Sequence, residues 1–496
     1  MASLVVAFFT RKVFLDQLGT EFIGLTGTLQ SLLGFLNLAE LGVGTAIGYV
    51  LYKPIFDDDK SKINEIISVF GYLYRYIGLV ILGAGIILSA FLPWIFPDTT
   101  FSWGVIYFGF YAYLASSMLG YFVNYRMTLL SADQKNYIVT GYFQLTSTTK
   151  VILQMILAIY VHSFYLYLAI EIIFGIINSI ILNIKINKTY PWLESDIKLG
   201  RQLFKKYPEI GKYVKQLFVH KIGGFVQFQI SPFLIYTFVS LPMVALYGNY
   251  TLITQRVQSF ISGILDSTSA GIGNLISEGN KEKIYLTYKE LFAFRFCISG
   301  ILSCCIFFSI TPFISLWLNQ NYILSNTIVL LATLHFFLYV LRGTTDQFLF
   351  GYGLFYDTWA PIVESILFVL TSIILGMKWG LIGVLYGPIV SMGIIVYIWK
   401  PFFLYNKGFK KTFRNYISLF VSHLIIIVVS YFISLSLLHF FIQDNYISET
   451  WKNWILGVLF FTIVMTVTTF SLFYITSLGM RTFINRFLKV YINKSK

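Results

Sequence analysis

The sequence predicts an all-α, polytopic membrane protein with about fourteen transmembrane helices. Two observations lead to this fold class. The 496-residue chain is 57% hydrophobic and only 12% charged, and its mean hydropathy is +0.74. Asp, Glu, Lys and Arg are also absent from four windows, 76–97, 99–125, 415–443 and 453–480. Each window exceeds the about 20 residues that a helix needs to cross a bilayer, and its apolar residues do not alternate as those of a membrane barrel would.

Apolar stretches and turn-forming residues place the spans along the chain. The first stretch is too short to cross a bilayer alone, so we expect native translation to begin upstream of Met1. The predicted spans are 1–15, 22–52, 66–95, 103–131, 137–161, 163–186, 213–239, 242–277, 286–317, 325–350, 356–377, 380–405, 415–441 and 453–479.

The net charge of +14 is distributed as in membrane proteins and does not indicate a nucleic-acid partner. Lys and Arg gather in alternate loops, namely 53–62, 185–215, 281–289, 400–414 and 481–496. The intervening loops near 97–102, 240–242 and 318–326 contain neither residue. The positive-inside rule therefore predicts that the basic loops and the C-terminus lie in the cytoplasm, against the membrane lipids.

An internal repeat predicts the domain organisation. A shift of 221 residues aligns 57–63 with 278–284, and a shift of 220 aligns 72–76 with 292–296. Two lobes of six spans each, in the same orientation, are typical of transporters with a substrate path between the lobes. The predicted parts are an N-terminal lobe at 1–186, a basic cytoplasmic linker at 187–212, a C-terminal lobe at 213–406, and two extra helices with a basic tail at 407–496.

Motifs for nucleotide or metal chemistry are missing from the sequence. Gly211-Lys212 lacks the upstream Gly and the following Ser or Thr of a P-loop. The three Cys and five His residues have no metal-ligand spacing, so we expect no metal, no cofactor and no catalytic residue. These residues are Cys297, Cys304, Cys305, His162, His220, His335, His423 and His439. Gly44-x-x-x-Gly48 and Gly383-x-x-x-Gly387 are typical of closely packed helices.

Charged residues inside the spans are the strongest functional signal, because they are costly in a membrane and usually face a watery cavity. Lys150 lies near the middle of span 137–161 and Arg256 near the middle of span 242–277. Polar residues recur at helical spacing on both sides of each of them, which predicts that one face of each helix lines a cavity. These residues are Thr140, Gln144, Ser147 and Gln154 around Lys150, and Asn249, Ser259, Gly263, Asp266 and Asn274 around Arg256. Lys221 is a further cavity candidate, although its long side chain could reach the membrane surface.

Other intramembrane charges leave several interpretations open. Asp266, Glu40, Glu171 and Glu364 are candidate sites for a coupling ion or proton. Alternatively, Arg256 and Asp266 form a buried ion pair with each other, or an ion pair with a residue of another helix. Arg342 and Asp346 are four residues apart on one helix and are expected to pair. Arg75 and Arg295, equivalent in the repeat, are expected to extend toward the membrane surface.

Three segments near the N-terminus carry a family resemblance. Residues 11–25 (RKVFLDQLGTEFIGL), 38–46 (LAELGVGTA) and 52–54 (YKP) resemble the opening signature of bacterial polysaccharide or O-antigen flippases. These are the Wzx-type members of the multidrug/oligosaccharidyl-lipid/polysaccharide exporter superfamily. The span count, the two-lobe repeat and the loop pattern extend the resemblance over nearly the whole chain.

The resemblance implies a MATE-like fold and a function. Such flippases move an undecaprenyl-diphosphate-linked oligosaccharide to the outer leaflet of the bacterial cytoplasmic membrane during surface polysaccharide biosynthesis, including that of lipopolysaccharide. The diphosphate would require cations, which Arg256, Lys150 and Lys221 could supply. The resemblance further implies a monomeric transporter that alternates between two states, with a polysaccharide polymerase as a partner.

Two other function classes remain open. A small-molecule exporter of the same fold would transport cationic drugs, and its cavity should be acidic and aromatic. A membrane enzyme, such as a polysaccharide polymerase or ligase, would usually carry a large catalytic loop on the outer side. The longest predicted outer loop, about 442–452, is short, which disfavours an enzyme.

Overall fold

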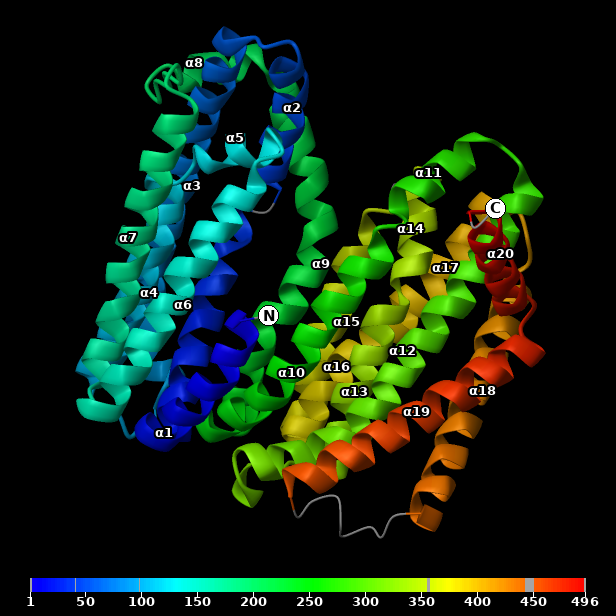
Figure 1. Cartoon of the computed structure of the whole chain (residues 1–496). Helices are drawn as coiled ribbons and strands as arrows, with labels where there is room; N and C mark the ends of the chain where they lie inside the picture. The colour runs from blue at the N-terminus through cyan, green and yellow to red at the C-terminus, as the bar shows by residue number, and fades with distance from the viewer. Residues whose placement is uncertain (1, 41, 98, 355–356, 442–449, 495–496) are drawn as a thin grey trace. The chain divides into compact units, whose positions relative to one another are not determined.

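The computed structural model describes residues 2–40, 42–97, 99–354, 357–441 and 450–494, although some side chains within the helices are not described (Figure 1). In these ranges the regular structure is helical throughout, without a strand. Nine of the described helices are long and apolar enough to cross a membrane. The predicted all-helical, polytopic fold is therefore confirmed.

The chain divides into two compact units, 1–245 and 246–496. Helix α9 (Pro208–Phe238), which begins within the predicted linker, packs in the first unit against α1 (Ala2–Leu36) and α2 (Val43–Phe56). Helix α10 begins in the first unit and continues into the second. The predicted lobes follow the sequence repeat, and their boundaries stay a prediction.

The first unit contains the following helices. They are α1 (Ala2–Leu36), η1 (Asn37–Glu40), α2 (Val43–Phe56), α3 (Lys60–Ile95), α4 (Trp103–Phe122), α5 (Met127–Ala132), α6 (Asn136–Tyr160), α7 (Phe164–Thr189), α8 (Gly200–Lys206) and α9 (Pro208–Phe238). Helix α1 joins segments that the sequence assigned to two spans, 1–15 and 22–52. The predicted break at 16–21 is a kink at Gly19, where φ is 84°. A side chain would disfavour that conformation.

The second unit is built from the helices that follow. They are α10 (Leu241–Asp266), α11 (Ser269–Ser277), α12 (Lys281–Trp317), η2 (Gln320–Tyr322), α13 (Asn326–Leu341), α14 (Gly343–Gly351), α15 (Trp359–Trp379), α16 (Leu381–Ile394), η3 (Ile395–Trp399), α17 (Lys400–Phe403), η4 (Leu404–Phe409), α18 (Phe413–Phe441), α19 (Trp451–Thr476) and α20 (Leu478–Lys494). The segments η3 and η4 are π-helical.

The long helices α3 and α12 begin in the same way, as the repeat suggests. Asp59 caps α3 by accepting a hydrogen bond from the Lys62 N–H, and Asn280 caps α12 through the Lys283 N–H. Each cap satisfies a donor that the first turn of a helix leaves free. Both caps lie in the segments that the shift of 221 residues aligns.

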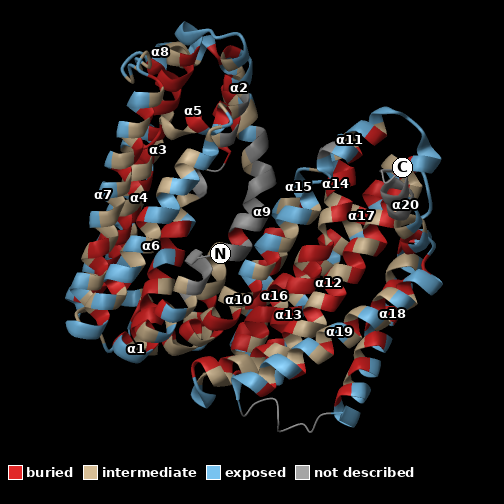
Figure 2. Cartoon of the chain, viewed as in Figure 1, coloured by how far each residue is buried: buried red, intermediate tan, exposed pale blue. Residues whose placement is uncertain are grey.

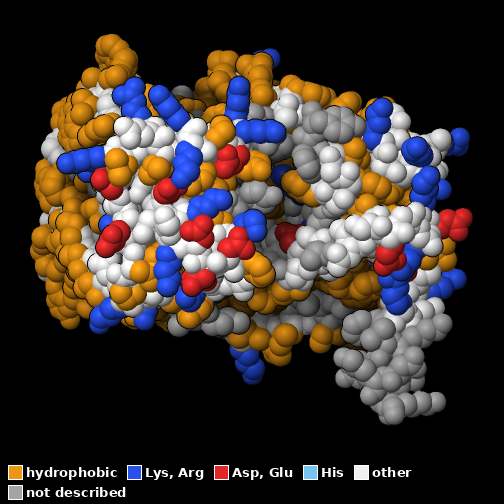
Figure 3. Space-filling model, turned by 90° about the horizontal axis from the view of Figure 1, so that it is seen from above, with side chains coloured by type: hydrophobic (Ala, Val, Ile, Leu, Met, Phe, Trp, Pro, Cys, Tyr) orange, Lys and Arg blue, Asp and Glu red, His pale blue; other side chains and the backbone are white. Residues whose placement is uncertain are grey.

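Basic segments gather at one end of the first unit. The predicted linker is folded onto α3 there, because Lys206 and Tyr207 both donate to Glu65 and the Asp196 N–H donates to Ser68. Figure 3 looks onto this end and shows Lys and Arg side chains among acidic ones in the part that carries α8. At the opposite end His162 contacts Gln17 at 2.7 Å. The loops therefore alternate between the two ends of the unit, as the charge pattern predicts.

Large apolar residues are exposed along α7 and α19. Figure 2 shows the exposed positions of these two helices in pale blue. On α7 they recur at helical spacing in Ile173, Ile177, Ile180 and Ile184. A continuous apolar stripe of this length fits lipid contact and would be unfavourable in water.

The second unit has a core centred on α12. Phe292 and Phe296 are buried there, and His423 of α18 packs against both rings. The basic tail also reaches this core, because α20 places Arg486 2.6 Å from the buried carboxylate of Glu290. The C-terminal segment is thus attached to α12 by an ion pair.

Candidate functional site

Lys150 and Glu171 form an ion pair within the first unit. Lys150 on α6 donates to both carboxylate oxygens of Glu171 on α7, at 2.7 and 2.9 Å. The two side chains are 21% and 14% exposed. From the sequence we expected separate roles for these residues, substrate binding for Lys150 and ion coupling for Glu171. The structure brings them together, so their charges balance each other.

This ion pair lines a polar cavity of about 300 Å³ between α4, α6 and α7. Helix α7 packs against both other helices, which creates the concave face. The polar and charged lining residues are Ser116, Ser117, Asn124, Thr146, Ser147, Lys150, Glu171, Asn178 and Ser179. A cavity of this polarity within apolar helices is typical of a binding site in a membrane protein.

A second carboxylate in the first unit is held by phenols. Glu40 accepts hydrogen bonds from Tyr74 of α3 and from Tyr121 of α4, the latter at 2.7 Å. Tyr121 also donates to Asn37, which Ser117 contacts at 3.4 Å. Because Ser117 lines the polar cavity, the Glu40 cluster adjoins it. Sequence periodicity did not predict these partners, which come from three separate helices.

Arg256 is exposed on α10 in the second unit. Ser259 and Gly263, which follow it on the same face, are exposed too, and no atom lies within 4 Å of a Cβ built at Gly263. Among the described residues, none forms a hydrogen bond or ion pair with the Arg256 guanidinium. The predicted polar face is therefore present on α10, but Asn249 at its start is buried.

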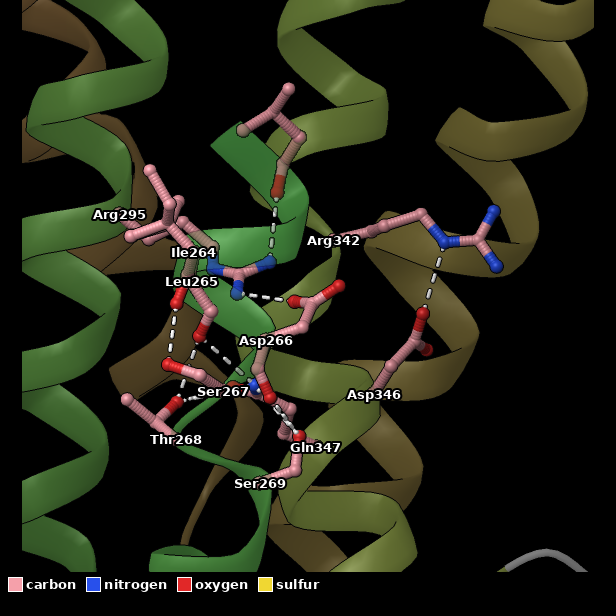
Figure 4. Close-up of polar contacts among 11 residues, drawn as sticks. Ile264, Leu265, Asp266, Ser267, Thr268, Ser269, Arg295, Arg342, Asp346 and Gln347 are labelled. Carbon is pink, nitrogen blue, oxygen red and sulfur yellow. Dashed lines mark hydrogen bonds and ion pairs between the residues drawn. The ribbon is translucent and has the colours of Figure 1, made fainter. Parts of the chain in front are cut away.

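Asp266 pairs with a different arginine from the one that the sequence suggested. Its carboxylate accepts from Arg295 of α12 at 2.6 Å, so the alternative of an Arg256–Asp266 pair is wrong (Figure 4). Arg295 also donates to the Val340 carbonyl at 3.1 Å, and its side chain is only 4% exposed. The expectation that Arg295 extends to the membrane surface is therefore wrong as well. Gly343 makes room for this guanidinium, because a Cβ there would overlap it.

The break between α10 and α11 is held by an amide side chain. Gln347 of α14 donates to Ser269 at 3.0 Å, to Thr268 at 3.2 Å and to the Leu265 carbonyl at 3.3 Å (Figure 4). These acceptors flank the position where the helix is interrupted, so Gln347 satisfies groups that the interruption frees. Nothing in the local sequence pattern indicated this role.

An ion network of three residues lies at the N-terminal end of α14. Arg342 donates to Asp346 at 2.9 Å, as the spacing of four residues predicts, and Lys400 reaches the other carboxylate oxygen at 2.7 Å. Glu364 is buried on α15. The side chain of Lys221, in α9, lies outside the described residues.

The fold and these polar groups define a class of protein, the polytopic helical membrane proteins. No protein-family model matches the chain, and no curated protein sequence does. Among solved structures, the chain is similar to the lipid II flippase MurJ in its inward closed conformation. The TM-score is 0.62 at 16% identity, over 95% of this chain and 97% of that chain.

The chain is also similar to an inward-facing multidrug resistance MATE family transporter of the MOP superfamily. Here the TM-score is 0.61 at 16% identity, over 80% of this chain and 92% of that chain. At such low identity the two likenesses show the fold alone.

Proposed function

We propose that the protein is a flippase for a lipid-linked oligosaccharide. It moves an undecaprenyl-diphosphate-linked oligosaccharide from the cytoplasmic to the outer leaflet by alternating access, for surface polysaccharide biosynthesis. It acts as a monomer in a bacterial cytoplasmic membrane, with its C-terminus in the cytoplasm and a polysaccharide polymerase as partner. A fold shared with a lipid II flippase over nearly the full length of both chains supports this proposal.

The observation that carries the proposal is that Arg256 has no ion-pair partner among the described residues. A guanidinium is permanently charged, and placing it in the middle of a predicted membrane span, here 242–277, is costly unless a counter-charge is provided. Since no described residue provides one, an anionic ligand is the natural partner. A diphosphate fits well, because the planar guanidinium can donate two parallel hydrogen bonds to phosphate oxygens.

Lys150 and Lys221 are weaker candidates for the same role. Lys150 would have to leave Glu171 before its ammonium could bind a phosphate. Among the carboxylates predicted to couple transport to an ion, Glu40 is a better candidate than Glu171 and Asp266. Those two already pair with cations. Glu364 remains a further candidate.

The proposal is tested in cells that lack their own polysaccharide flippase. Arg256→Ala should lower polymer export by about tenfold or more, since a lost charge-assisted hydrogen bond costs roughly 1.5–3 kcal/mol. Arg256→Lys should restore export only in part, because an ammonium lacks the bidentate geometry. The matched control is Gln255→Ala, the exposed neighbour on α10. Normal export by a well-expressed Arg256→Ala protein would exclude this residue from the mechanism.

A cation-coupled drug exporter is the second candidate function. It is favoured by the likeness to a multidrug resistance transporter at nearly the same TM-score, and by Glu40, a carboxylate surrounded by tyrosines. The drug-exporter alternative predicts that Glu40, and not Arg256, is required. Expression should protect cells from cationic drugs, Glu40→Gln should abolish that protection, and Arg256→Ala should leave it unchanged.

A further inference from the structure

We infer that the polar cavity of the first unit is a subsite for a neutral, hydroxyl-bearing ring, meaning one sugar residue of the transported molecule. This inference rests on the proposed function and makes it more specific. It assigns the diphosphate and the sugar to different residues, the former to Arg256 and the latter to the cavity around Lys150 and Glu171.

The charge balance of the cavity argues for a neutral ligand. Lys150 and Glu171 contact each other through both carboxylate oxygens, so the lining has no net charge. An anion entering the cavity would be repelled by Glu171, and a metal cation by Lys150. The pair can still accept and donate hydrogen bonds toward a ligand, because both side chains are partly exposed.

Several hydrogen-bonding groups in the lining are not used within the protein. Asn178 accepts from Thr146 through its carbonyl oxygen at 3.1 Å, and this leaves its NH₂ group available. For the hydroxyls of Ser116 and Ser147, the described residues provide no hydrogen bond. Hydroxyls that each donate and accept are suited to the hydroxyls of a sugar.

Size and shape agree with a single ring. A cavity of about 300 Å³ lies at the lower end of the range for ligand sites, which excludes a whole oligosaccharide. Phe143 and Phe174 also line it and provide apolar ring faces. Gly120 faces open space in the lining, since a Cβ there would meet no atom within 4 Å, whereas at Gly175 it would lie 2.9 Å from the Ser116 hydroxyl.

The test is direct binding of simple glycosides to the purified full-length protein. Methyl glycosides of glucose, galactose and N-acetylglucosamine are used as probes, and binding is read by saturation-transfer NMR. Gly120→Leu adds a side chain whose Cβ meets no atom within 4 Å, so it should fill the cavity and abolish the signal. Gly141→Leu is the matched control, because it also projects into open space but lies outside the lining. Should Gly120→Leu not fold, Ser147→Leu fills the same cavity from α6.

Binding of at least one glycoside that is lost in Gly120→Leu and kept in Gly141→Leu supports the subsite. Three outcomes would overturn it: no glycoside binds the wild-type protein, binding survives the filled cavity, or inorganic pyrophosphate displaces the glycoside. The proposed function fails separately, through normal export by Arg256→Ala. That variant should bind glycosides as well as the wild-type protein does.

Discussion

Individual charged residues in this protein are stabilised by partners from distant parts of the chain. Arg342 and Asp346 were expected to pair because four residues separate them on one helix. Lys400, the third member of that network, lies 54 residues away and could not be predicted in the same way. Helical periodicity indicates which face a residue occupies, but not which neighbouring helix that face meets. For that reason the Lys150–Glu171 and Asp266–Arg295 pairs were also missed.

Asp346→Ala should destabilise the second unit. It removes the carboxylate that contacts both Arg342 and Lys400 in the ion pairs described above, and leaves two mostly buried cations without this shared partner. We expect the free energy of unfolding to fall by about 2–3 kcal/mol, somewhat less than for a fully buried ion pair. A lower melting temperature of the purified protein would show this.

Two comparisons make this result specific. Asp57→Ala removes the equivalent partner from an exposed pair, Lys53–Asp57, and should cost less than about 0.5 kcal/mol. Adding Lys400→Met to Asp346→Ala should recover part of the loss, because one buried charge is removed. A melting temperature unchanged by Asp346→Ala would mean that the network does not contribute to stability.

At the level of elements, glycine spacing predicted close packing correctly in one motif and at one glycine of the other, because a Cβ at Gly44 would lie 3.3 Å from the Tyr74 hydroxyl of α3. A Cβ at Gly383 would overlap the backbone of Leu375, and one at Gly387 would overlap Ser372, so α16 lies directly against α15. At Gly48 no atom lies within 4 Å of the added Cβ. The motif alone does not say whether a partner helix lies over its glycines.

The two motifs provide a matched pair of substitutions. Gly383→Ala should reduce stability by about 1–3 kcal/mol or more, because a backbone carbonyl cannot rotate away from the new methyl group. Gly48→Ala should be neutral or slightly stabilising, since alanine is the better helix former. Folded yield after size-exclusion chromatography measures both. An equal effect of the two substitutions would contradict the packing described for α15 and α16.

The sequence predicted where helices occur better than it predicted where they are interrupted. The kink at Gly19 falls inside a stretch that reads as a polar turn between two spans, whereas α1 continues through it. The break after Asp266 is stabilised by Gln347, which lies about eighty residues further along the chain. The break after Asp266 thus depends on a long-range contact, which a local pattern cannot indicate.

For the whole molecule, composition was sufficient to predict an all-helical membrane fold, because backbone groups in lipid must be satisfied within each helix. The alternation of basic loops also predicts a topology. Reporter fusions after Lys205 and Lys410 should indicate the cytoplasm, and fusions after His162 and Gln320 the opposite side. Fusions after Lys53 control for the first unit and should agree with Lys205. A cytoplasmic signal at Gln320 would contradict the model of about fourteen spans.

The packing of α9 against α1 has a consequence for the order of events during synthesis. Ser31 donates to the Gln229 carbonyl, and a Cβ at Gly34 would overlap the Gln229 side chain, so this face of α1 is shaped for a helix made much later. At about 5–20 residues per second, some 10–40 seconds separate the translation of the two segments. During that interval the face of α1 that later contacts α9 is not yet covered. Biogenesis of the unit therefore depends on whatever shields that face until α9 emerges from the ribosome.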